Sequence, residues 1–168
     1  MTTELARLRI RDCLAFDDRQ YLLFTAVHEA GHAVAGAATG DFWMGETVLT
    51  IHPGALTDAY TEVSWGDIRT QLVYLPGGEL AQMRWLHEQR LWTAMRGRAT
   101  RNAALHDHAA LRSLGFDWRA RHAAAQEADA HLARHWSAVL DVAGRLAAAG
   151  RISGDEVCEV MNHHLFAP

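Results

Sequence analysis

The sequence contains no lysine and little cysteine. All 16 basic side chains among its 168 residues are arginines. Without lysine, the chain cannot form a Schiff base or build the lysine-containing phosphate loop, GxxxxGK, of P-loop ATPases. The two cysteines, Cys13 and Cys158, stand near opposite ends of the chain and form no CxxC pair. A cysteine-ligated zinc site is therefore excluded, and we expect two free thiols rather than a disulfide.

Long apolar runs and an excess of positive charge are also absent. No stretch approaches the roughly 18 apolar residues of a membrane span, and residues 1–19 carry charges throughout in place of a secretory signal. With 16 basic and 20 acidic side chains, the formal net charge is -4, which gives no basic footprint for nucleic acid. We expect one cytoplasmic domain, residues 1–168, that binds neither a membrane nor nucleic acid.

The spacing of apolar residues predicts a mainly α-helical fold. The clearest helix covers residues 17–39, with Asp17 or Asp18 as its N-cap and Gly40 at its end. A helix over residues 67–85 is expected to kink or break at Pro76. Further helices are expected over residues 86–101, 107–114, 117–149 (as one helix or two, closed by Gly150) and 153–162, the last opened by a capping box at Ser153 and Glu156.

A small β-hairpin or short sheet accompanies these helices. Residues 47–51 and 60–65 favour strands, and a turn at Pro53 and Gly54 separates them. Two strands alone are marginally stable, so this element must pack on the helices. The stretch 59–65 has two interpretations of equal weight: an edge strand that binds an extended peptide, or a structural hairpin.

The first helix carries the motif His28-Glu29-Ala30-Gly31-His32, which has the pattern HExxH. Histidines at positions i and i+4 lie on one helix face, so both imidazoles can bind one zinc ion. The glutamate beside the first ligand is then placed to act as a general base on a zinc-bound water. Gly31 costs helix stability, which indicates close approach by another element.

A catalytic zinc needs a third protein ligand, and the motif does not supply it. The extended form HExxHxxGxxH is absent, since Ala35 and Ala38 occupy the relevant positions. The residues themselves leave several candidates open, namely His52, Glu79, His87, His106, Asp107 and His108.

The run from Ala26 to Val34 resembles the zinc-binding helix of the FtsH-type peptidase domain, the proteolytic part of membrane AAA proteases. Later features follow in a similar order: Thr50-Ile51-His52-Pro53, Gly77-Gly78, residues 102–114 and Gly154-Asp155-Glu156-Val157. The resemblance covers residues 24–160 and implies an FtsH-peptidase-like helical fold. It also implies that Asp107 is the third zinc ligand, beside His28 and His32, with Glu29 catalytic.

The sequence departs from that family in several places. It contains neither the ATPase nor the membrane anchor, so we expect it not to unfold substrates with ATP by itself. Gln82 stands where the family usually has glutamate, and Pro76 precedes the paired glycines. The related proteases form hexameric rings to which the ATPase contributes, which leaves open here a homo-oligomer or a separate protein partner.

Two further clusters have both a plain and a functional interpretation. His131 and His135 repeat the i, i+4 spacing but lack the adjacent glutamate, so a second metal site is the weaker interpretation. A set of arginines forms either a solvated helix face or a surface for an acidic partner: Arg84, Arg90, Arg96, Arg98 and Arg101.

The sequence thus predicts an ATP-independent zinc metallopeptidase that hydrolyses unstructured peptides or protein segments. The alternative is a non-catalytic zinc-binding module, derived from such a peptidase, that binds another protein. Glu29 favours the enzyme, because a structural zinc site has no need of that carboxylate.

Overall fold

The computed structural model describes residues 10–40, 42–51, 57–65 and 67–166. The described part is mainly helical with a three-stranded antiparallel sheet, as the sequence predicts. Residues 10–14 are helical and are followed by these elements: α2 (Asp18–Ala37), β1 (Phe42–Ile51), β2 (Thr57–Trp65), α3 (Ile68–Glu88), α4 (Ala94–Ala103), α5 (Leu105–Ser113), α6 (Trp118–Arg134), α7 (Trp136–Ala149), β3 (Arg151–Ser153) and α8 (Gly154–Phe166).

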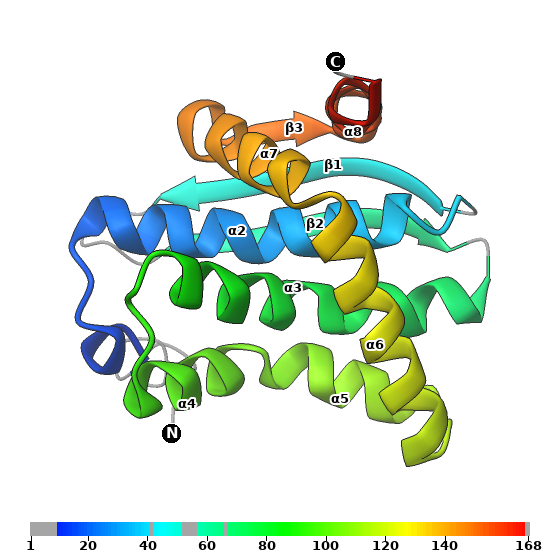
Figure 1. Ribbon diagram of the computed structural model, residues 1–168, viewed down its shortest axis with the longest axis horizontal. Coiled ribbons are helices and arrows are strands. Elements are labelled where there is room, and N and C mark those ends of the chain that lie inside the picture. The colour runs from blue at the N-terminus through cyan, green and yellow to red at the C-terminus, as the bar shows by residue number, and fades with distance from the viewer. Residues whose placement is uncertain (1–9, 41, 52–56, 66, 167–168) are drawn as a thin grey trace.

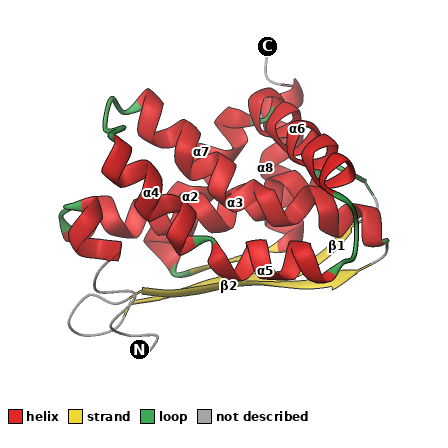
Figure 2. Cartoon of the chain, turned by 90° about the horizontal axis from the view of Figure 1, so that it is seen from below, coloured by secondary structure: helices red, strands yellow, loops and turns green. Residues whose placement is uncertain are grey.

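The strands lie along one side of the molecule and the helices on the other (Figure 2). The strand order is β2-β1-β3, with both pairs antiparallel. The register of β1 against β2 shifts between Met44 and Thr47. Beyond this irregularity Thr47 pairs with Thr61 on β2 and with Ile152 on β3. Among the described strands, β2 pairs only with β1, so it forms one edge of the sheet.

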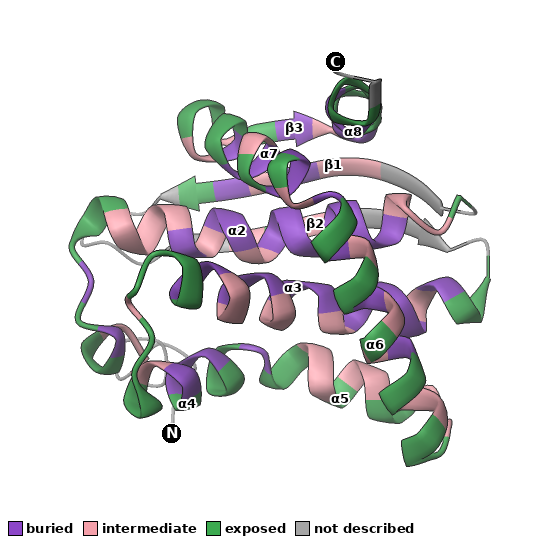
Figure 3. Ribbon diagram, in the orientation of Figure 1, coloured by how far each residue is buried: buried purple, intermediate pink, exposed green. Residues whose placement is uncertain are grey.

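Helix α2 runs through the centre of the molecule between the sheet, α3 and α7 (Figure 1). It begins at a capping box in which the Asp17 carboxylate accepts from the Gln20 amide at 2.7 Å. Most residues from Phe24 to Gly36 are buried, as Figure 3 shows for this helix. Phe24 and Val34 belong to the main hydrophobic cluster, which also takes in side chains from α3, α7 and α8. This burial stabilises α2 and fixes its orientation.

Several local predictions are confirmed. Gly150 closes α7 in the left-handed region at φ 76°. The capping box at Ser153 is present: the Glu156 carboxylate accepts from the Ser153 amide at 2.8 Å. The helix that follows, α8, extends beyond the predicted end at residue 162 to Phe166. Both cysteines are free. None of the described helices is long and apolar enough to cross a membrane.

Three predictions about the elements need correction. Of the kink or break expected at Pro76, the break is absent: α3 is one helix from Ile68 to Glu88. Close packing of its middle turns against α2 holds the segment helical. The predicted helix over residues 86–101 is two pieces: α3 ends at Glu88, and α4 begins after the cap at Thr93. Strand β3 was not predicted, since three residues form a strand only by pairing with β1.

Helices α2 and α3 approach each other backbone to backbone at two glycines. A Cβ added to Gly31 would lie 2.5 Å from both the Gly77 carbonyl oxygen and the Ala81 Cβ. A Cβ on Gly77 would lie 2.7 Å from the Gly31 carbonyl oxygen. Only glycine fits at this crossing, which accounts for the helix-weakening residue inside the HExxH motif.

We predict that Gly31→Ala lowers the free energy of unfolding by about 1–3 kcal/mol, since overpacking outweighs the better helix propensity of alanine. The matched control is Gly144→Ala on α7, where an added Cβ meets nothing within 4 Å. There we expect a gain of about 0.5–1 kcal/mol. Urea unfolding of both variants checks this, and a Gly31→Ala protein as stable as Gly144→Ala would contradict the close crossing.

Candidate metal centre

Three side chains predicted from the sequence meet between α2 and α5. His28 and His32 project from successive turns of α2, and their Nε2 atoms lie 3.0 Å apart. Asp107 comes from the first turn of α5. Its Oδ2 lies 3.2 Å from His28 Nε2 and 3.5 Å from His32 Nε2. The three donor atoms form a compact triangle, with all three side chains partly or fully buried.

The size of this triangle fits a tetrahedral metal ion. Ligands held about 2.0–2.1 Å from zinc in tetrahedral geometry lie about 3.3–3.4 Å from one another, and the observed separations of 3.0, 3.2 and 3.5 Å bracket that value. Two imidazoles and one carboxylate are also a donor set typical of catalytic zinc. His28, His32 and Asp107 are therefore the residues that would hold the ion, with its fourth position open.

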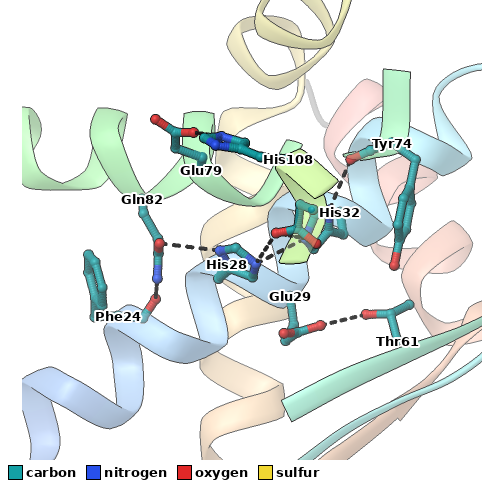
Figure 4. A network of polar contacts seen from close by, with 10 residues as sticks. Phe24, His28, Glu29, His32, Thr61, Tyr74, Glu79, Gln82 and His108 are labelled. Carbon is teal, nitrogen blue, oxygen red and sulfur yellow. Dashed lines mark hydrogen bonds and ion pairs between the residues drawn. The ribbon is translucent and has the colours of Figure 1, made fainter. Parts of the chain in front are cut away.

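Both imidazoles are oriented by hydrogen bonds on their far nitrogens (Figure 4). His32 Nδ1 donates to the Tyr74 backbone oxygen at 2.9 Å. His28 Nδ1 donates to Gln82 Oε1 at 3.2 Å, while Gln82 Nε2 donates to the Phe24 backbone oxygen at 3.0 Å. Because each Nδ1 carries the proton, each Nε2 presents its lone pair to the centre. Gln82, a departure from the resembled family, still offers His28 an oxygen.

Gly78 of α3 packs directly against the imidazoles of His28 and His32. A Cβ added at this position would lie 2.5 Å from His32 Nε2 and 2.7 Å from His28 Nε2. Any larger residue here would displace the metal-binding atoms of both rings. The paired glycines Gly77 and Gly78 thus serve different contacts, one with the α2 backbone and one with the imidazoles.

Electrostatics within the cluster favour ionised Asp107. Burial raises the pKa of Asp107, but hydrogen bonds with His28 and His32 outweigh it and hold the pKa well below its ordinary range. Burial lowers the pKa of His32, but the hydrogen bond and charge of Asp107, together with the charge of Glu29, raise it overall. Both shifts arise from the same contact between the Asp107 carboxylate and the His32 imidazole.

The catalytic candidate Glu29 lies on the sheet side of α2 and is 7% exposed. Its Oε2 accepts from Thr61 Oγ1 at 2.9 Å (Figure 4). Thr61 Oγ1 in turn accepts from Thr47 Oγ1 at 3.3 Å. The second carboxylate oxygen, Oε1, is not used in this contact. Two strands thereby hold the carboxylate of Glu29 in one orientation.

Tyr74 closes the wall beside His32. Its ring stacks on the imidazole with centroids 4.6 Å apart and an interplanar angle of 22°. Burial and the charge of Glu29 raise the pKa of the Tyr74 hydroxyl far above its ordinary value, so the hydroxyl keeps its proton. Sequence analysis missed Tyr74, Thr61 and Thr47 as parts of this site, because no local pattern distinguishes them from ordinary core residues.

A cavity of about 470 Å³ opens onto the cluster. His28, Glu29 and Asp107 line it on one side, and Thr61 from the edge strand β2 lines it as well. Much of the remaining wall is apolar, formed by Ile10, Leu14, Tyr21, Phe24, Ala59, Tyr60 and Leu105. The described lining includes no arginine.

The other proposed third ligands lie elsewhere. Glu79 and His108 bind each other at 2.5 Å. His87 stacks on Trp92, His106 is exposed at the cavity rim, and His52 lies outside the described residues. Over the described parts of the chain, His28, His32 and Asp107 are the only grouping with metal-binding geometry, which leaves the His131–His135 pair without a third ligand.

The arginine set divides between structural and exposed positions. Arg96 donates to the Leu14 and Leu91 backbone oxygens at 2.7 and 2.9 Å. Arg84 pairs with Asp129 at 3.0 Å. The other members, Arg90, Arg98 and Arg101, are exposed. Two of the five arginines thus make contacts within the chain, and a role of the set toward an acidic partner stays a prediction.

Compared with known proteins, the chain matches no family model and no curated protein. The resemblance to FtsH-type peptidases rests on the residues quoted from the sequence and stays a prediction.

We predict that the protein binds about one zinc per chain after purification without chelators. Asp107→Ala should weaken zinc affinity at least about 100-fold, more than the loss typical of residues outside the ligand shell. Asp155→Ala, an exposed position on α8, is the control and should bind as the wild type does. Competition with a chromophoric chelator measures these affinities, and equal affinity of the two variants would exclude Asp107 as a ligand.

Proposed function

We propose that the protein is an ATP-independent zinc metallopeptidase that hydrolyses unstructured peptides or flexible protein segments. The observation that carries the proposal is the buried carboxylate of Glu29, one residue from a metal ligand and exposed to the same cavity. Zinc in a site of this kind supplies Lewis acidity: it lowers the pKa of a coordinated water to about 7 and polarises a carbonyl. The resemblance of the HExxH helix to FtsH-type peptidases supports the same function.

Glu29 would act as the proton carrier. Thr61 donates to Oε2, which leaves Oε1 to accept a proton from the attacking water as a peptide carbonyl is attacked. The same carboxyl then passes this proton to the nitrogen of the leaving amine, so that Glu29 ends ionised. The hydrogen bonds from the strands keep the carboxylate from turning away between these two steps.

The edge strand β2 offers a binding place for the substrate backbone. Ala59, Tyr60 and Thr61 line the cavity, and in the described sheet β2 pairs with a neighbour on one side only. An extended peptide can add to that edge by main-chain hydrogen bonds. A folded protein cannot present such a strand, which is the reason for proposing unstructured substrates.

We predict that Glu29→Gln keeps its zinc but lowers kcat/KM for an unfolded protein substrate by about 10²–10⁴-fold, because the general base is lost. Glu127→Gln, on the distant helix α6, is the control and should retain activity. The measurement pairs zinc content with cleavage of a quenched fluorescent peptide. A zinc-loaded wild type that cleaves no unfolded substrate would instead favour the non-catalytic module.

The apolar wall of the cavity predicts a preference among peptides. Substrates with Leu or Phe beside the cleaved bond should have kcat/KM at least about tenfold above those with Asp, since the apolar wall would desolvate the Asp carboxylate and the described lining offers it no arginine. Cleavage of a peptide library, read by mass spectrometry, measures this preference. Faster cleavage beside acidic residues would contradict the assignment of the cavity as the substrate site.

A further inference from the structure

The third ligand, Asp107, is carried by a helix with weak anchorage of its own. Helix α5 has nine residues, and none of them is buried. Its N-cap, Ala104, is buried but makes no side-chain capping bond. Near its other end, Leu111 is partly buried against the hydrophobic cluster that α3 and α6 form with Leu72, Val73, Ala124 and Ala128. This apolar contact holds the C-terminal half of α5 but leaves the turn that bears Asp107 to be fixed by other means.

A hydrogen-bonded pair fixes that turn to α3. His108 Nε2 donates to Glu79 Oε2 at 2.5 Å, and both side chains are partly sheltered. Glu79 follows Gly78, the residue packed against both metal-binding imidazoles. Figure 4 shows the pair bridging α3 and α5 beside His28. The contact thus joins α5 to the part of α3 that already sets the positions of His28 and His32.

Asp107 and His108 are neighbours on α5, so the contact of His108 with Glu79 affects the direction of the Asp107 side chain. Consecutive side chains on a helix point about 100° apart, so Asp107 can face the imidazoles while His108 faces α3. His108 and Leu111 lie on one face at i, i+3. Attachment along that face opposes rotation of α5 about its axis, and such a rotation would carry the Asp107 carboxylate away from the metal position.

We propose that His108 and Glu79 are positioning residues for the metal centre: their contact orients α5 and holds Asp107 at ligand distance from His28 and His32. The inference rests on the proposed metal centre but not on peptide hydrolysis. It applies in the metal-free protein too, where the same contact keeps the first turn of α5 docked.

The test compares two histidines that flank Asp107. His108→Ala should weaken zinc affinity about 10–100-fold, the loss typical of residues that orient metal ligands. His106→Ala removes an exposed side chain from the same turn and should change affinity by no more than about twofold. In the metal-free proteins, hydrogen exchange of the α5 amides should be faster in His108→Ala than in the wild type and in His106→Ala.

Variants of Glu79, the hydrogen-bond partner of His108, distinguish a positioning role of this contact from a general loss of structure. Glu79→Ala should weaken zinc affinity as His108→Ala does, whereas Glu79→Gln keeps an oxygen acceptor and should recover most of it. The double variant Glu79→Ala/His108→Ala should bind zinc no more weakly than either single variant, because both remove one contact.

Wild-type zinc affinity in His108→Ala, or equal losses in His108→Ala and His106→Ala, would overturn the proposal. Failure of the proposed function gives a different result, namely a wild type that binds zinc tightly but cleaves no peptide. In that event the affinities of these variants still decide whether the pair positions Asp107.

Discussion

The crossing of α2 and α3 at glycine determines where the two histidines of the candidate site lie relative to the groups that orient them. With Gly31 and Gly77 in backbone contact, α3 comes close enough for Tyr74 and Gln82 to accept hydrogen bonds from the two metal-binding histidines. Gly78 follows and leaves room for both imidazoles. A larger residue at any of these glycines would separate the helices or displace the rings, so packing and chemistry depend on one contact.

The site divides its tasks among separate elements. The rigid, buried helix α2 supplies two ligands and the carboxylate of Glu29, while α3 orients the imidazoles from behind. The sheet holds Glu29 through Thr61, and its edge borders the cavity. Asp107 comes from α5, none of whose side chains is buried. Under the proposed function, metal affinity would depend on how well α5 is docked, whereas the orientation of Glu29 would not.

Local signals in the sequence predict some of this arrangement and miss the rest for physical reasons. Caps at Asp17, Ser153 and Gly150 act within a few residues, so they are readable without the fold. The path of α3 through Pro76 and the existence of β3 depend on neighbours distant in sequence, and both were missed. The HExxH motif is local and predicts His28, Glu29 and His32. The choice of Asp107 among six candidates depended on a family resemblance, because only the docking of α5 brings it to the histidines.

We propose that His28, His32 and Asp107 would hold a zinc ion with one position open. A crystal structure of the zinc-loaded protein, with anomalous scattering measured at the zinc edge, would show where the ion binds. We expect one peak about 2.0–2.2 Å from both Nε2 atoms and from an Asp107 oxygen, with no fourth protein ligand. A peak at another site, such as the His131–His135 pair, or a fourth side chain closing the coordination sphere would contradict it.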